Sequence, residues 1–208
     1  MTERGMIFNA EMVRAILDGR KTQTRRVMKP QPANDIERGT FPNAEAYGWV
    51  SSLKHKYGSA TAHFCPFGAV GDRIWVREAF RVMGCATDVA RLMYKASERN
   101  SFTESTRTVP VASCTKQPSQ KWTPSIHMPR WASRITLEIT DVRVERLQAI
   151  TLGDICKEIG CGLYDFRPVT YGFQVWEELW QSIYGADSWQ ANPWVWVIEF
   201  KRVDGEAK

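Results

Sequence analysis

The sequence lacks several features that would place it in a common class of protein. No segment approaches the roughly 20 apolar residues of a membrane-spanning helix, and the start, MTERGMIFN, has no apolar stretch typical of a secretory signal. The five cysteines form no CxxC pair, only three histidines occur, and there is no glycine-rich phosphate loop. We therefore expect a cytoplasmic protein with reduced thiols and no membrane partner, metal or cofactor. The oligomeric state is not indicated.

The composition is that of an ordinary globular domain. Of the 208 residues, 43% are hydrophobic and 25% are charged, which predicts a single domain over residues 1–208. The formal net charge is +5 and the isoelectric point is about 9.0, a modest bias toward anionic partners. The nine tryptophans indicate an aromatic-rich core, or rings that stack on bases.

The hydrophobic periodicity predicts strands that cluster and do not alternate with helices. This order indicates an α+β fold. Two proline-containing stretches, about 30–70 and 97–125, are expected to be irregular insertions. The expected strands are 6–9, 73–80, 134–147 and 194–203, and the expected helices are 10–19, 151–159 and 173–184.

Four segments carry a resemblance to a known family. They are ILDGRKTQTRR (16–26), GDRIWVRE (71–78), DICKE (154–158) and WVIEF (196–200). In order and spacing they resemble the ASCH family of the PUA-like superfamily. With HMPRWA (127–132), the whole chain is similar to the longer members encoded by phages and prophages. The resemblance implies a PUA-like β-barrel with flanking helices, long loop insertions, and a cleft near the KTxT turn.

The resemblance also implies a function. The family is expected to bind RNA, and some small bacterial members hydrolyse the acetyl amide of N4-acetylcytidine with a lysine, a threonine and a glutamate. Lys21 and Thr24 match the first two, and Glu158 is the candidate for the third. The long insertions depart from these small enzymes, and they could cover the cleft or change its substrate.

The residues are consistent with such chemistry. The Thr24 hydroxyl is a nucleophile, and Lys21 lies three residues away on a tight turn. Neighbouring like charges from Arg20, Arg25 and Arg26 should lower the pKa of Lys21 and let it act as a base. A carboxylate such as Glu158 would orient the exocyclic nitrogen or relay a proton. The alternative is that Lys21 and the three arginines only contact phosphates.

Four further residues are predicted to bind substrate, each with a structural alternative. A Trp beside an Arg suits base stacking with phosphate contact, or a core Trp covered by a surface Arg. Glu78 could accept hydrogen bonds from a base edge or pair with the basic turn. These four residues are Trp75, Glu78, Arg130 and Trp131.

Four functions remain open from the sequence. The first is hydrolysis of the N4-acyl amide of a modified cytidine, and the second is non-catalytic RNA binding. The third is a ribonuclease that uses the same basic cleft, with His127 as its acid–base residue. The fourth is a phage-encoded partner or inhibitor of a host protein. The expected ligand is RNA or a modified pyrimidine nucleoside.

Overall fold

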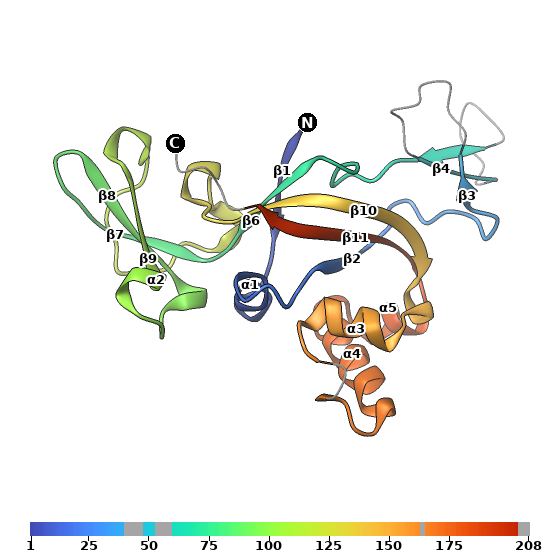
Figure 1. The fold of residues 1–208 in the computed structure, drawn as a ribbon. Helices are drawn as coiled ribbons and strands as arrows, with labels where there is room; N and C mark the ends of the chain where they lie inside the picture. Colours follow the sequence, from blue (N-terminus) through green and yellow to red (C-terminus); the bar gives the residue numbers. More distant parts are fainter. Residues whose placement is uncertain (40–47, 53–59, 163–164, 204–208) are drawn as a thin grey trace. The chain divides into compact units, whose positions relative to one another are not determined.

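The computed structural model describes residues 1–39, 48–52, 60–162 and 165–203, and it confirms the α+β class (Figure 1). The chain divides into two compact units, one of residues 1–21, 72–138 and 201–208 and one of residues 22–71 and 139–200. The boundary runs through two long strands, β10 (Thr136–Arg146) and β11 (Trp194–Val203), so each unit holds part of both.

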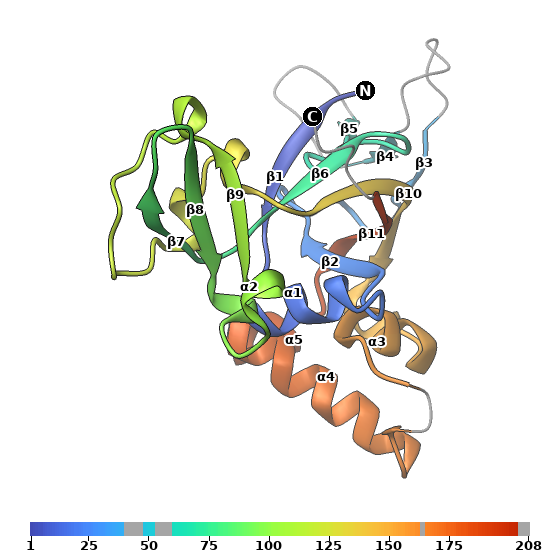
Figure 2. The ribbon, with the colours of Figure 1, turned by 60° about the vertical axis from the view of Figure 1, so that its left-hand side comes forward.

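The first unit contains strands from three separate parts of the chain. In one sheet β1 runs parallel to β6, and β6 pairs with β10 in antiparallel fashion. In the other sheet β7, β8 and β9 are antiparallel, and they lie side by side in Figure 2. The elements are β1 (Glu3–Ile7), α1 (Ala10–Leu17), β6 (Arg73–Arg77), β7 (Phe80–Cys85), β8 (Val89–Tyr94), α2 (Phe102–Ser105) and β9 (Thr106–Pro110), with the 3-10 helices η1 (Lys95–Ser97), η2 (Val111–Ser113), η3 (Ser125–His127) and η4 (Arg130–Ala132).

The expected alternation along β6 is confirmed. Ile74 and Val76 are buried, while Trp75 and Arg77 lie on the other face and are partly exposed. Gly5, opposite Trp75 in the register, is needed there because a Cβ would lie 2.6 Å from the indole ring. The strand ends at Arg77 and β7 begins at Phe80, so the single strand expected over 73–80 is divided in two.

The first helix begins and ends where the sequence predicts. The side chain of Asn9 accepts a hydrogen bond from the backbone N–H of Met12 at 2.8 Å, which caps the start of α1. Gly19 follows the helix with φ of 71°, a conformation that favours glycine. The Arg20–Lys21 turn therefore follows directly after the end of the helix.

The second unit packs helices against one face of a sheet. Its sheet has the order β10-β11-β2, and the antiparallel strands β3, β4 and β5 form a separate small sheet. Figure 1 shows α3, α4 and α5 gathered together. The elements are β2 (Gln23–Val27), β3 (Glu37–Arg38), β4 (Trp49–Ser51), β5 (Thr61–His63), the 3-10 helix η5 (Leu147–Ala149), α3 (Leu152–Ile159), α4 (Val169–Tyr184) and α5 (Ala186–Gln190).

The core of the second unit explains why these helices form. Ile155 from α3, Trp176 and Trp180 from α4, and Val195 and Val197 from β11 are all buried in one cluster. The Thr151 side chain accepts from the backbone N–H of Asp154, as predicted for the start of α3. The apolar face of α4 thus meets the apolar face of β11.

The two stretches expected to be irregular contain more regular structure than the sequence indicated. Residues 30–70 include β3, β4 and β5, and residues 97–125 include α2 and β9. The strands β3 to β5 have only two or three residues each, too few for a visible period of alternation. Part of the first stretch, residues 40–47 and 53–59, lies outside the described residues.

The strand pairings of the described residues give open sheets and no closed barrel. The mixed α+β class is therefore established, and the PUA-like barrel stays a prediction. In the part of the chain that the structure describes, every helix is too short or too polar to span a bilayer.

The buried face of α4 can be tested with two substitutions on the same helix. Trp180 is 2% exposed, so Trp180→Ala should lower the free energy of unfolding by about 3–5 kcal/mol. Ile183 is 47% exposed, so Ile183→Ala should change it by less than about 1 kcal/mol. Urea denaturation followed by circular dichroism measures both, and equal losses would contradict this packing.

Candidate functional site

Three consecutive polar residues of β2 are buried. Gln23, Thr24 and Arg25 are between 0% and 3% exposed. In the antiparallel register Gln23 lies opposite Glu199, Thr24 opposite Ile198, and Arg25 opposite Val197. Because side chains alternate along a strand, Gln23 and Arg25 share one face of the sheet and Thr24 points to the other.

Arg25 is held by carboxylates from two other elements. Its Nη1 donates to Oε1 of Glu158 at 3.2 Å, and its Nη2 donates to Oε2 of Glu145 at 2.9 Å. A third carboxylate, Asp154 on α3, lies 3.6 Å from Nη2. The Arg25 side chain is completely buried, so these contacts replace the water that its charge would otherwise bind.

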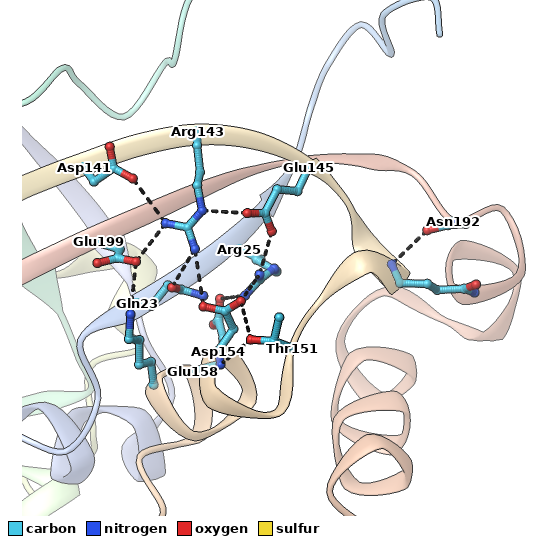
Figure 3. Close-up of polar contacts among 12 residues, drawn as sticks. Gln23, Arg25, Asp141, Arg143, Glu145, Thr151, Asp154, Glu158, Asn192 and Glu199 are labelled. Carbon is cyan, nitrogen blue, oxygen red and sulfur yellow. Dashed lines mark hydrogen bonds and ion pairs between the residues drawn. The ribbon is translucent and has the colours of Figure 1, made fainter. Parts of the chain in front are cut away.

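A second arginine, Arg143 on β10, extends this cluster (Figure 3). Its Nε donates to Glu145 at 2.6 Å, and Nη2 donates to Asp154 at 3.3 Å. Glu145 and Asp154 thus contact both arginines. The remaining partners of Arg143 are Asp141 at 3.2 Å, Glu199 at 2.8 Å and Gln23 at 3.1 Å. We call this set the Arg25–Arg143 network.

The network favours the ionised form of two of its carboxylates, Asp154 and Glu199. Burial alone would raise the pKa of Asp154, but the hydrogen bond from Thr151 and the charges of Arg25 and Arg143 outweigh it. The pKa of Asp154 is therefore lowered. Burial is likewise outweighed at Glu199 by hydrogen bonds from Arg143 and Lys157, so its pKa is also lowered. The network ties β2, β10, β11 and α3 together through charge.

The structure places the three predicted catalytic residues differently. Lys21, in the first unit, is 2% exposed in the turn after α1, where its backbone N–H donates to the carbonyl of Ala15 at 3.0 Å. Thr24 and Glu158 are both 3% exposed in the second unit. Glu158 binds Arg25, on the face of β2 opposite to Thr24. The structure therefore does not bring the Thr24 hydroxyl and the Glu158 carboxylate together.

The face of the sheet that carries Thr24 also carries Trp196. Trp196 lies two residues from Ile198, the partner of Thr24 in the register, so both point to the same side. Trp196 meets Trp49 edge to face, with ring centroids 5.1 Å apart. Beside it is a hollow of about 240 Å³, whose lining residues are Met28, Lys29, Pro30, Thr61, Ala62, His63, Phe64 and Trp196.

His63 gives this hollow a defined polar group. Its Nε2 lies 2.9 Å from the Oγ of Ser51, and both side chains are buried. Burial lowers the pKa of His63, which keeps the imidazole neutral at neutral pH. A neutral ring can donate or accept a hydrogen bond at the wall of the hollow.

The three arginines of the basic turn have different environments. Arg20 is exposed and pairs with Asp18 at 2.7 Å, while Arg25 is enclosed by carboxylates. Arg26, on β2, lies opposite Trp196 of β11 and is partly exposed. The positive charges of Arg20 and Arg25 are therefore balanced locally, which weakens the prediction that they lower the pKa of Lys21.

Two of the four remaining predicted binding residues have structural partners in the core. Glu78 is 2% exposed and accepts from Nε and Nη2 of Arg134 at 2.9 and 3.1 Å. Burial raises the pKa of Glu78, and the Arg134 contacts partly offset this. Trp131 packs edge to face on Phe80, with centroids 6.1 Å apart, beside the core of the β7-β8-β9 sheet.

The other two lie at the surface. The Arg77 guanidinium lies 5.3 Å from the ring centre of Trp75. Trp75 is partly exposed. Arg130 forms an exposed ion pair with Glu3 at 2.9 Å.

Most of the Arg25–Arg143 network was not predicted from the sequence. Asp154 was noted only as part of the DICKE segment, and Asp141, Arg143 and Glu145 were given no role. A signal was present, because these three charges alternate with Val142 and Val144 along β10 and so share one face. Which residues they pair with depends on β2 and α3, which are distant in sequence.

A scan against protein-family models, a search of curated proteins and a search of solved structures each find no match. Among the described residues, no group of three or more His, Cys, Asp or Glu side chains is arranged to hold a metal ion.

The structural role of Glu78 can be tested through its partner. Arg134→Met would leave the Glu78 carboxylate buried without its counter-ion, so the free energy of unfolding should fall by about 3–5 kcal/mol. Arg130→Met is the matched control, because its ion pair with Glu3 is exposed and should be worth less than about 1 kcal/mol. Chemical denaturation compares them, and a small loss for Arg134→Met would reopen Glu78 as a ligand-binding residue.

The network predicts a specific dependence on acid. Carboxylates with lowered pKa values, such as Asp154 and Glu199, stabilise the folded state when the pH is above their ordinary pKa values of 3.8 and 4.5. This stability is lost as the pH falls through their lower folded-state values. Arg143→Met removes a cause of both shifts, so stability near neutral pH should fall and its decline between about pH 5 and pH 2 should be shallower.

Urea midpoints measured across this range test the prediction. The control is Lys201→Met, which removes an exposed cation paired with Glu138 and should leave the pH profile nearly unchanged. If Arg143→Met and the wild type declined in parallel, the network would not control the acid response.

Proposed function

We propose that this chain is a PUA-like protein of the ASCH type that handles RNA or a modified pyrimidine nucleoside. We further propose that it hydrolyses the N4-acyl amide of a modified cytidine. The observation that supports this most is the burial of Lys21 and Thr24 within the segment that carries the family motif. Lysine is almost never fully buried without a specific partner or role.

The proposed reaction uses the threonine as nucleophile. The Thr24 hydroxyl attacks the carbonyl carbon of the amide, and the Lys21 amine takes the hydroxyl proton. Lys21 then gives this proton to N4 as the C–N bond breaks, which releases cytidine and leaves the acyl group on Thr24. A water molecule then attacks the carbonyl carbon of the resulting ester while Lys21 takes its proton. The bond between the acyl carbon and Oγ of Thr24 breaks, the proton passes from Lys21 to Oγ, and the acyl group leaves as a carboxylic acid.

Glu158 has a positioning role in this proposal. Its contact with Arg25 fixes β2 against α3, and Arg25 adjoins Thr24 in the chain. The carboxylate thus acts through Arg25 on the strand that carries the nucleophile, instead of contacting substrate. This replaces the direct role in proton relay that the resemblance implied for Glu158.

The hollow beside Trp196 supports a nucleoside as ligand. It lies against the strand pair that carries Thr24, on the same side of the sheet. An aromatic ring, a neutral imidazole and the cation of Lys29 together suit a planar polar base. We propose that the pyrimidine ring binds there, with its acylated nitrogen directed toward Thr24.

The proposed function is tested by incubating the full chain with N4-acetylcytidine and following cytidine release by chromatography. Thr24→Val and Lys21→Met should each reduce the rate by at least about a hundredfold, because each removes a reacting group. Thr140→Val, a threonine exposed on β10, is the matched control and should retain the rate. Circular dichroism confirms that each variant folds.

Two outcomes would count against the proposal. Retained release in both active-site variants would remove Lys21 and Thr24 from the mechanism. No release by the wild-type chain would leave these residues as binding residues for RNA or a nucleoside, without turnover.

A further inference from the structure

The β7-β8-β9 sheet has one face in the core and one face directed outward. Phe80, Val82, Leu92, Tyr94 and Val109 are buried on the inner face. The residues between them point the other way, and the register aligns them across the strands. Across the three strands, one row consists of Arg81, Met93 and Thr106, and a second row consists of Gly84, Arg91 and Thr108. We call these six residues the outer face.

The outer face carries positive charge and no acidic side chain. Arg81 and Arg91 lie on it, and none of the three strands contains an acidic residue. Arg107 lies opposite the buried Leu92 and so points to the inner side, where its Nη1 donates to the carbonyl of Ser133.

Residues 80–122 hold seven Lys and Arg side chains against three acids, Asp88, Glu98 and Glu104, a net charge of +4. Residues 1–30 also carry +4, and the remainder of the chain is net negative. The segment that contains this sheet is therefore one of two that hold the excess positive charge of the chain.

Two arginines of the outer face are already stacked on aromatic rings. The Arg81 guanidinium lies 4.8 Å from the ring centre of Trp122, and that of Arg91 lies 5.1 Å from the ring centre of Phe102. Arg81 is also fixed by hydrogen bonds to the carbonyl and side chain of Gln120 at 3.2 and 3.1 Å. A planar cation held in this way can stack on a base with little further loss of side-chain freedom.

The same region exposes large apolar side chains and a hollow. Phe102 is 54% exposed, Val89 43% and Met83 39%. Beside Arg91 is a hollow of about 380 Å³, whose lining residues are Met83, Gly84, Cys85, Ala86, Val89 and Arg91. Exposed apolar and aromatic groups next to arginines provide contacts for flat rings as well as for charge.

We propose that the outer face of the β7-β8-β9 sheet docks single-stranded RNA. The arginines meet the phosphates and bases, Phe102 and Trp122 support the stacked rings, and the hollow beside Arg91 accepts a base. Thr108, opposite Arg91 in the register, offers a hydroxyl that can hydrogen-bond a 2′-hydroxyl. We infer the position of the docking face from the residues of this sheet alone, whereas the choice of RNA over DNA also rests on the proposed function.

Charge and ring chemistry favour RNA over an acidic protein as the occupant. An acidic peptide would satisfy the arginines but offers few flat rings to stack on them. Single-stranded nucleic acid supplies both a repeating negative charge and successive flat bases. A double helix hides its bases in the stack, so a single strand fits an arginine–aromatic face better.

The test uses fluorescence anisotropy of a labelled 12-nucleotide RNA of mixed sequence with the full chain. Arg91→Gln should weaken binding at least about fivefold, and the Arg81→Gln/Arg91→Gln double variant should weaken it further. Phe102→Ala keeps every charge but removes an exposed ring, and it should also weaken binding severalfold. Lys201→Gln removes one exposed charge outside the outer face and should change the affinity less than twofold.

Three results would overturn the inference. The first is a double variant that binds RNA as tightly as the wild type while remaining folded by circular dichroism. The second is a poly-glutamate peptide that displaces RNA at equal charge concentration. The third is a DNA strand of the same sequence that binds as tightly as RNA. Anisotropy involves no turnover, so failure of docking and failure of amide hydrolysis are read independently.

Discussion

The buried guanidinium of Arg25 determines how the second unit is assembled. It is fully enclosed, and carboxylates from β10 and α3 surround it. Removing Arg25 would leave these carboxylates without their shared cation in a medium that solvates charge poorly, so the pairing favours the packing of β2 against β10 and α3. Arg143 reinforces this constraint because it shares Glu145 and Asp154 with Arg25. Charge pairing, in addition to apolar packing, therefore fixes the position of β2.

This constraint separates the two faces of β2. On one face, Gln23 and Arg25 belong to the Arg25–Arg143 network and stabilise the fold. The other face carries Thr24 and, two residues along the partner strand, Trp196 with its adjoining hollow. A chemical role for this strand is consequently expected on the Thr24 side, and Glu158 contributes from the opposite side through Arg25.

The first unit uses charge in a different way. Inside it, Glu78 and Arg134 form one buried pair, and Tyr94 donates to the carbonyl of Ala132 at 2.8 Å. Outside, the β7-β8-β9 sheet presents arginines stacked on rings. From the sequence, nucleic-acid contact was predicted at the basic turn 20–26 and at Trp75, Arg130 and Trp131. Arg81 and Arg91 were given no role, because only the strand register places them side by side on one face of the β7-β8-β9 sheet.

The sequence by itself determined the α+β class, the caps at Asn9 and Thr151, and the long strands and helices. Each depends on local periodicity or on hydrogen bonds between near neighbours, which a sequence displays directly. Only the tertiary structure decided that Glu158 binds Arg25, that Glu78 binds Arg134, and that Thr24 faces away from both Arg25 and Glu158. These partners are 56 and 133 residues apart, and strand register and helix packing, which depend on the whole chain, bring them together.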